Sequence, residues 1–372
     1  MKKKILFTAT ISHHIISFHL PYLKWFKDQG YEVHVAANGH ANIPYCDKFI
    51  NIGFERSPFK ISNLKAYKDL KRNIDNNNYS LIHCHTPMGG VLTRIAGINS
   101  RKRGTKVVYT AHGFHFFKGA PLKNWLLYFP IEYILAKKTD VIITINKEDF
   151  DIANKYNFRA GKIRFINGVG INLEEFQPQT FDSKTMLREE YGFNEKDFIL
   201  IYAGELSYRK HQDLLIDVVA LLKDKIPNIK LLLAGTGTLF DQFKKQINVK
   251  EVSEQVELLG FRNDITNLMM LSDISVSSSR QEGLPVNVME SMATGLPLVV
   301  TNCRGNRDLV TNGKNGYILE IDDLQGFSES VKLLYDSEEI RFDFSKSNIN
   351  KIKQYSIKNV LNEMEDVYNS LL

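Results

Sequence analysis

Two glutamates with seven residues between them, Glu282 and Glu290, form the pattern in this 372-residue chain that points most directly to chemistry. They enclose the stretch EGLPVNVME. On a helix, eight positions cover roughly 12 Å along the axis at about 1.5 Å per residue. Two carboxylates so placed could hold hydroxyl groups at both ends of an extended ligand. The alternative is that both are water-exposed carboxylates on a helix face, which is the usual place for a glutamate.

The residues between the glutamates favour an anion. Asp273–Ser277 predicts a strand, and Pro285 stands where we expect the first helical residue, since its ring presets φ where the N–H would be unpaired anyway. The helix should end at Gly295, before a strand over Leu296–Thr301. Its first amides would lie at the positive end of the helix dipole, which suits a phosphate. We therefore expect a phosphate-binding turn made of Gly283, Leu284, Pro285, Val286 and Asn287.

The motif EGLPVNVME, in this strand–turn–helix context, resembles the signature of the retaining glycosyltransferases of family 4. The resemblance runs through nearly the whole chain. It implies the GT-B fold, an α/β architecture of two Rossmann-like domains with doubly wound parallel sheets facing a cleft. It also implies that Glu282 contacts the transferred sugar and that Glu290 contacts the ribose of a nucleotide diphosphate sugar.

Composition is that of a soluble globular chain, with 43% hydrophobic and 24% charged residues, and the length suits two domains. Residues 1–180 carry 26 Lys and Arg against 13 Asp and Glu, a net of +13, and the remainder carries 22 against 29, a net of −7, which sums to the overall +6. Three cysteines without metal spacing fit a reducing compartment. The apolar run Ile5–Ile11 predicts a buried strand rather than a secretion signal.

Strands and helices alternate in both halves, which predicts parallel sheets with a ligand crevice at the carboxyl ends of the strands. The absence of GxGxxG after the first strand argues against a dinucleotide-dependent dehydrogenase. His112 follows the strand Lys106–Thr110, and the resemblance implies that it touches the transferred sugar. Where many family members have a glycine pair, the chain has Thr10-Ile11-Ser12-His13-His14. We assign the acceptor pocket to His13, His14, Phe18 and His115, with ordinary surface or core histidines as the alternative.

Loops of the second half carry the remaining donor contacts. The resemblance places the lysine six residues after Gly204, Lys210, on the donor diphosphate, and Arg209 could replace an arginine that the family commonly has where this chain has Glu205. A solvated basic loop is the alternative. Weaker matches, at a second glycine loop and a base-contacting turn, add Gly235, Gly237, Phe261 and Arg262.

We predict no catalytic metal and no cofactor. Asp149-Phe150-Asp151 spells DxD, but inside an apparent helix positions i and i+2 face different ways. Asp322-Asp323 reads as the N-cap of the following helix.

Turn-rich residues 167–178 resemble the family's exit from the first domain. The predicted division is an acceptor-binding domain over residues 1–178, a nucleotide-sugar-binding domain over 179–355, and a terminal helix over 356–372 that could cross back to the first domain.

The stretches TAHGFHFF, AGELSYRKHQ and CRGNRDLV look closest to bacterial enzymes of capsule and exopolysaccharide assembly. The resemblance implies transfer of a hexose or N-acetylhexosamine from a nucleotide sugar, with UDP expected, to a polyprenyl-diphosphate-linked saccharide. The basic, aromatic segment Lys123–Lys138 favours a peripheral place on the inner, anionic face of the plasma membrane, with a core-packed helix as the alternative. A nucleotide-sugar epimerase and a non-catalytic subunit stay open, and no nucleic-acid-binding motif is visible.

Overall fold

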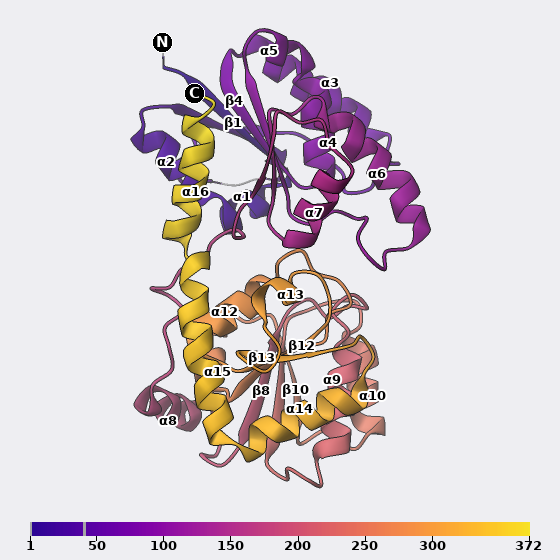
Figure 1. The fold of residues 1–372 in the computed structure, drawn as a ribbon, viewed down its shortest axis with the longest axis vertical. Helices are drawn as coiled ribbons and strands as arrows, with labels where there is room; N and C mark the ends of the chain where they lie inside the picture. Colours follow the sequence, from indigo (N-terminus) through magenta and orange to yellow (C-terminus); the bar gives the residue numbers. More distant parts are fainter. Residues whose placement is uncertain (1, 40–41) are drawn as a thin grey trace. The chain divides into compact units, whose positions relative to one another are not determined.

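The structure is a computed structural model that describes residues 2–39 and 42–372. The chain forms two compact units, which are described separately below. Unit 1 comprises the chain up to Gly170 together with Ile357–Leu372, and unit 2 comprises Ile171–Ser356 (Figure 1).

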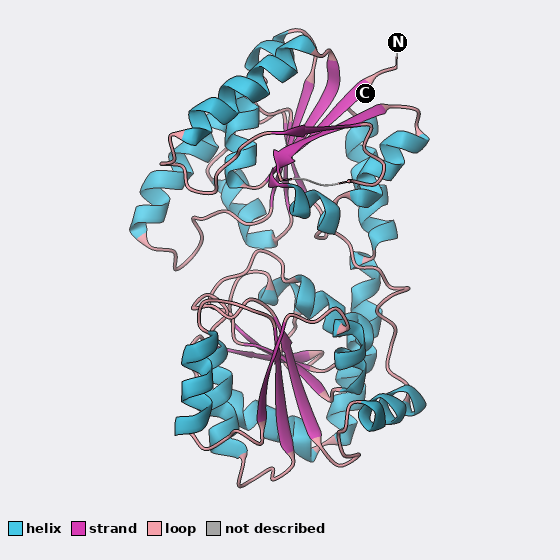
Figure 2. Cartoon of the chain, turned by 180° about the vertical axis from the view of Figure 1, so that it is seen from behind, coloured by secondary structure: helices cyan, strands magenta, loops and turns pink. Residues whose placement is uncertain are grey.

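Unit 1 is built on a parallel sheet with the strand order β3-β2-β1-β4-β5-β6-β7. In the centre, Phe7 pairs with Val35 on one side and His83 on the other. The five inner strands are buried along most of their length because helices cover both faces of the sheet (Figure 2). Their bounds are β1 (Lys4–Ile11), β2 (Glu32–Asn38), β3 (Lys48–Asn51), β4 (Tyr79–His85), β5 (Lys106–Ala111), β6 (Val141–Thr144) and β7 (Lys162–Phe165).

One face of this sheet packs against α1 (Ser12–Phe18), α2 (Leu20–Asp28) and α16 (Ile357–Asn369). The other face packs against α3 (Ser62–Asn76) and α4 (Pro87–Ala96), and towards β6 against α6 (Leu122–Ala136) and α7 (Lys147–Lys155). The short α5 (Ile98–Lys102) follows α4. This arrangement brings the last helix of the chain into the core of unit 1.

Unit 2 repeats the plan with the strand order β10-β9-β8-β11-β12-β13, again all parallel. The bounds are β8 (Phe198–Ala203), β9 (Ile229–Ala234), β10 (Val256–Gly260), β11 (Ile274–Ser277), β12 (Leu298–Thr301) and β13 (Gly316–Leu319). One face packs against α9 (Gln212–Leu222), α10 (Phe240–Val249), α14 (Leu324–Asp336) and Phe344 of α15 (Glu338–Lys351). Towards the other face lie α8 (Phe181–Glu190), α11 (Ile265–Leu271) and α12 (Val286–Thr294), where Ser291 donates to Ser275 of β11. The short helices α13 (Asn306–Leu309) and η1 (Ile352–Tyr355) complete the unit.

The domain boundaries differ from the predicted ones. The first unit ends at Gly170 rather than at 178, and the chain returns to it at Ile357. Ile171 bridges to Ser356, and its amide donates to the carbonyl of Tyr355 at 2.9 Å. Because of this bridge, residues 171–178 belong to unit 2, and the turn-rich stretch ends unit 1 earlier than its composition indicated.

Several elements are absent from the sequence prediction. One of them is α1, which begins directly after β1 and covers residues 12–18. Short or polar elements were also missed, among them β3, β7, α4, α8 and α15. Strands of four residues with exposed positions, such as β7, give too little periodicity to be recognised.

The helix in the segment Lys123–Lys138 packs some of its apolar side chains on the core and exposes others. Trp125, Phe129 and Tyr133 of α6 pack against the core of unit 1, so these aromatic rings do not form an outer face. Leu122, Leu126 and Ile134 of the same helix are 72%, 70% and 59% exposed. None of the described helices has both the length and the apolar character needed to cross a membrane.

The terminal helix α16 is tied to the sheet by one buried hydrogen bond, between Tyr368 and His83 of β4, whose oxygen and Nδ1 lie 2.8 Å apart. Replacing Tyr368 by Phe leaves this imidazole nitrogen without its partner, and we expect a loss of about 1–3 kcal/mol in the free energy of unfolding. Urea unfolding measures it. Tyr45→Phe, at an exposed position, is the control and should change stability by less than about 0.5 kcal/mol. Equal effects of the two substitutions would contradict the anchoring role of Tyr368.

Candidate functional site

The carboxylate of Glu282 is the centre of a buried polar cluster in unit 2. Its Oε1 accepts from Lys210 Nζ at 2.6 Å and from Ser279 Oγ at 2.6 Å, and its Oε2 lies 3.4 Å from Nη1 of Arg209. Glu282 and Lys210 are only 6% and 8% exposed, whereas the Arg209 side chain is 44% exposed. The structure thus brings together three of the residues that the sequence analysis assigned to the reaction.

The loops that carry this cluster are fixed to each other by backbone contacts. Lys210 lies in the loop between β8 and α9, and its carbonyl accepts from Ser278 Oγ at 3.0 Å. The amide of Arg280 donates to the carbonyl of Arg209 at 2.9 Å. Since β8 and β11 are neighbours at the point where the strand order reverses, the cluster lies at the edge of the sheet where doubly wound folds bind ligands.

Both charges of the pair are stabilised by their neighbours. Burial by itself would raise the pKa of Glu282, but Lys210, Arg209 and the hydrogen bonds from Lys210 and Ser279 hold it below its ordinary value. Burial would lower the pKa of Lys210, and the Tyr202 hydroxyl and Glu282 raise it instead. At neutral pH the site therefore holds a fixed ammonium beside a fixed carboxylate.

Two glycine loops close one side of this region. A Cβ at Gly235, which has φ +147°, would lie 2.0 Å from the carbonyl oxygen of Gly204, and a Cβ at Gly237 would lie 2.0 Å from that of Leu206. These approaches exclude any side chain at either position. Gly204 lies next to Lys210, and Asn287 donates to the carbonyl of Ala203 at 2.8 Å. The predicted glycines and Asn287 thus lie around the Lys210 loop.

The turn before α12 differs in one detail from the prediction. Pro285 is the N-cap, with φ −75° and ψ 116°, and the helix begins at Val286. The first amides still have no carbonyl of the same helix to bind. Gly305 packs so closely on Gly283 that a Cβ there would lie 2.5 Å from the Gly283 oxygen. Gly295 ends the helix in the left-handed conformation, as predicted.

Glu290, the second glutamate of the motif, lies on α12. No hydrogen bond or ion pair links its carboxylate to another residue that the structure describes. Burial, and secondarily the charge of Glu175, raise its pKa to about 7. The Glu290 carboxyl is therefore about half protonated at neutral pH, whereas that of Glu282 is ionised.

In the turn that was predicted to contact the base, one of the two side chains is exposed and the other is held within the protein. Phe261 is 75% exposed, while Arg262 donates its Nε to Asp264 at 2.7 Å and is held there. The turn adjoins the glycine loop, because the amide of Gly235 donates to the carbonyl of Gly260 at 2.7 Å.

In unit 1, two of the predicted histidines meet. The Nε2 atoms of His14 and His112 lie 3.2 Å apart, and Nδ1 of His85 lies 3.3 Å from the Nε2 of His112. Burial, and the neighbouring His13, lower the pKa of His14 to about 4, and burial likewise lowers the pKa of His112 and His85. These imidazoles are neutral at physiological pH.

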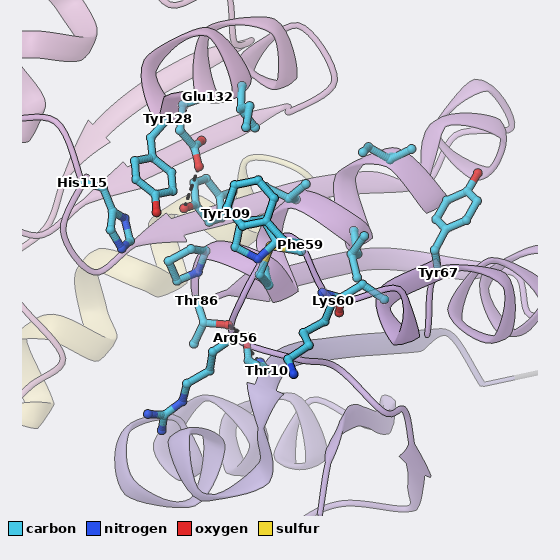
Figure 3. Close-up of a pocket in the computed structure, with 18 of the residues that line it drawn as sticks. Thr10, Arg56, Phe59, Lys60, Tyr67, Thr86, Tyr109, His115, Tyr128 and Glu132 are labelled. Atoms are coloured by element: carbon cyan, nitrogen blue, oxygen red, sulfur yellow. Dashed lines mark hydrogen bonds between the residues drawn. The ribbon is translucent and has the colours of Figure 1, made fainter. Parts of the chain in front are cut away.

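The other acceptor candidates do not join this contact between ring nitrogens. His13 is exposed, and its ring nitrogen lies 3.2 Å from the hydroxyl of Ser17. Phe18 packs edge-on against His14, and His115 packs against Tyr128. A cavity of about 850 Å³ in unit 1 is lined by His14 and His115 together with mostly apolar residues of α3, α4 and α6. Figure 3 shows Arg56 and Lys60 on one side of this cavity and the hydrogen-bonded pair Tyr109 and Glu132 on another.

Sequence reasoning missed several residues of both clusters. Ser279 donates to Glu282 and is hydrogen-bonded to Tyr202, with the two hydroxyl oxygens 2.6 Å apart, and Arg304 Nε donates to the carbonyl of Glu282 at 2.9 Å. The serine run that follows β11 was a usable signal for the first of these. His19 and His85 also escaped notice, although HCH at the end of an apolar run places two imidazoles on one face of a strand.

The DxD sequence is split by its helix. Asp149 is fully buried and accepts from the amide of Phe114 at 2.9 Å, whereas Asp151 is exposed and lies 3.7 Å from Lys147. The two carboxylates face different surroundings, as the helical periodicity predicted.

Each of the two units matches a known protein family. Residues 183–351 fit the family of glycosyl transferases group 1, and residues 4–146 fit the glycosyl transferase 4-like family. The chain is 44% identical over its full length to a putative glycosyltransferase, EpsD, of Bacillus subtilis, covering 98% of that protein. It is 30% identical, over 83% of its length and 80% of the relative, to an Escherichia coli UDP-Gal:alpha-D-GlcNAc-diphosphoundecaprenol alpha-1,3-galactosyltransferase.

Solved structures show the same fold at low sequence identity. The Anabaena protein Alr3699/HepE, solved with UDP and glucose, has a TM-score of 0.81 at 19% identity, with 99% of this chain and 100% of that chain covered. Sucrose-phosphate synthase from Thermosynechococcus elongatus has a TM-score of 0.80 at 16% identity, covering 100% and 99%. The two parallel-sheet units and the identity to whole-length relatives lead to one conclusion: this chain is a glycosyltransferase of group 1 with the GT-B fold.

Proposed function

We propose that the chain is a retaining glycosyltransferase that moves a hexose or an N-acetylhexosamine from a UDP-sugar to a hydroxyl of a polyprenyl-diphosphate-linked saccharide. The observation that carries the proposal is the buried Lys210–Glu282 pair beside the glycine loops of unit 2. Support for the acceptor comes from two relatives, whose names describe transfer onto diphosphoundecaprenol-linked sugars, and support for UDP comes from the first of these names.

Unit 2 would hold the donor. Lys210 uses one ammonium proton for Glu282 and has two more for the diphosphate, and the exposed Arg209 and the amides that open α12 add positive potential. As the sugar departs, negative charge grows on the diphosphate, and these fixed groups stabilise it without rearrangement. With two cations and a helix N-terminus available, we propose that no metal ion is needed at the diphosphate.

Glu282 would orient the sugar rather than attack it. Its carboxylate is engaged by Lys210 and Ser279 and approached by Arg209, so its lone pairs are largely occupied. The acceptor hydroxyl would then attack from the face that the diphosphate leaves, and the leaving phosphate oxygen would take its proton. Glu290, with its raised pKa, would meet the ribose hydroxyls as a donor and as an acceptor.

Unit 1 would bind the acceptor. Its cavity is large and mostly apolar, which suits the first part of a polyprenyl chain, and Arg56 and Lys60 at its edge suit the acceptor diphosphate. Nδ1 of His112 would contact the transferred sugar. The exposed leucines of α6, with Lys123, Lys137 and Lys138 near its ends, would rest on the anionic inner face of the plasma membrane, so we propose a peripheral cytoplasmic enzyme.

A donor panel tests the reaction. Purified protein is mixed with UDP- and GDP-sugars and with membrane extract as the source of acceptor, and released nucleotide diphosphate is measured. We expect turnover with one UDP-sugar, and a loss of about 100-fold or more in kcat for Glu282→Gln, since a fixed polar contact to the reacting sugar is removed. The matched control, Glu257→Gln on an exposed position of β10, should retain full activity. Conversion of the donor without acceptor would indicate an epimerase, and binding without turnover across the panel would indicate a non-catalytic subunit.

The buried pair gives a second prediction. Lys210→Met should destabilise the protein by about 3–5 kcal/mol, because it leaves the Glu282 carboxylate buried without its main cation. The double variant Lys210→Met/Glu282→Gln should be more stable than Lys210→Met, because the uncompensated charge is gone. Urea unfolding of the four proteins in this cycle measures the coupling. Additive effects would mean that the pair is not energetically coupled.

The raised pKa of Glu290 predicts a pH dependence of stability. Between the ordinary glutamate pKa of 4.5 and the folded value of about 7, the folded protein binds more protons at this site than the unfolded chain does. The free energy of unfolding from this group therefore falls as the pH rises through that window. We expect Glu290→Gln to flatten the wild-type decline between pH 5 and about pH 7, as measured by urea midpoints. An unchanged pH profile in the variant would show that Glu290 titrates normally.

A further inference from the structure

Four histidines of unit 1 converge on one point. His14 lies on α1, His19 directly follows that helix, His85 ends β4, and His112 follows β5. One ring nitrogen from each lies within 4.8 Å of those of the other three. Among the described residues, this is the group of side chains arranged in a way that could ligate a metal ion.

The hydrogen bonds of this cluster leave buried ring nitrogens without a partner. His19 is 1% exposed, and neither of its ring nitrogens has a hydrogen-bond partner. Buried polar groups normally have partners, because leaving one unpaired costs free energy. The single Nε2 of His112 meanwhile faces a nitrogen of His14 and a nitrogen of His85. Neutral imidazoles have one donor and one acceptor each, so a proton-sharing network does not account for the nitrogens of His19.

The distances fit a tetrahedral metal site. With Zn–N bonds of about 2.0–2.1 Å, two ligating nitrogens lie about 3.3–3.4 Å apart and the ring centres about 5 Å apart. The two nitrogen contacts to His112 measure 3.2 and 3.3 Å. Five of the six ring-centre distances in the cluster are 4.5, 5.1, 5.5, 5.6 and 6.0 Å. The sixth, between the stacked rings of His19 and His85, is 3.7 Å, so one of these two rings must turn to complete the tetrahedron.

We propose that His14, His19, His85 and His112 bind one divalent transition-metal ion of the zinc class. Imidazole ligands favour zinc and its neighbours over magnesium and calcium, which prefer oxygen. The ion would fasten α1 to the carboxyl ends of β4 and β5, beside the cavity that His14 also lines. It would leave Nδ1 of His112 available to the sugar. This site is separate from the diphosphate site of unit 2, and its existence does not depend on the proposed transfer reaction.

Metal content and cobalt spectra test the proposal on the full chain, expressed without a histidine tag. After dialysis against a chelator, the wild type is titrated with Zn²⁺ and, as a spectroscopic probe, with Co²⁺. We expect one zinc per chain, a rise in Tm on adding zinc, and the intense visible band of tetrahedral cobalt at one equivalent. His19→Gln and His85→Gln should each weaken binding more than about 100-fold, since even partners beyond the ligands contribute about 10–100-fold. His13→Gln, on the exposed neighbour of His14, is the control and should bind as the wild type does.

Absence of a cobalt band and of bound zinc in the wild type would overturn the proposal, as would unaltered binding in both cluster variants. If a variant fails to fold, the wild-type cobalt titration decides alone, because it needs no substitution. Urea unfolding with chelator present adds a further check. The two cluster variants should then be about as stable as the metal-free wild type, whereas a purely structural role for these imidazoles would make them less stable.

Discussion

The interaction on which the candidate site of unit 2 depends is the ion pair between Lys210 and Glu282. An ammonium and a carboxylate with their atoms 2.6 Å apart, both largely buried, are stable only if each is also satisfied by neighbours. Here Ser279 and Arg209 complete the carboxylate, and the close approach of the Gly235 backbone to Gly204 fixes the loop that lies next to Lys210. The pair is costly to build and has little value for stability alone. In the proposed reaction, its use is to hold two charges at fixed places beside the diphosphate.

The two units apply the same topology to different chemistry. In each sheet the strand order reverses once, between β1 and β4 in unit 1 and between β8 and β11 in unit 2. Loops diverge at these points and leave room for a ligand at the carboxyl edge. Unit 2 fills its reversal point with charges. At the reversal point of unit 1 lie neutral imidazoles, beside a mostly apolar cavity. This difference supports the proposed assignment of an anionic donor to unit 2 and of a lipid-linked acceptor to unit 1.

Much of the fold followed from the sequence because strands covered on both faces appear as continuous apolar runs and amphipathic helices have a helical periodicity. The strands predicted over Lys106–Thr110, Asp273–Ser277 and Leu296–Thr301 correspond to β5, β11 and β12 with ends shifted by about one or two residues, and Gly295 ended its helix as expected. The resemblance assigned Glu282 to the sugar and Lys210 to the diphosphate, with Arg209 as a substitute cation, and the structure brings the three side chains together. What could not be predicted depends on contacts between distant segments. The Ile171–Ser356 bridge moves the boundary, Ser279 and Tyr202 enter the site through the packing of β8 on β11, and His19 and His85 meet only in the folded unit. Local patterns carry no information on such partners.

The anomeric configuration of the product tests most directly the proposal that the transfer retains configuration. The purified enzyme, an α-configured UDP-sugar and a synthetic polyprenyl-diphosphate saccharide would yield a disaccharide whose linkage can be read by NMR. An α linkage is the expected result, because the acceptor attacks from the side on which the diphosphate leaves and Glu282, held by Lys210, does not act as a base on the opposite face. A β linkage would show that the configuration is inverted, and it would contradict the proposed role of the Lys210–Glu282 pair.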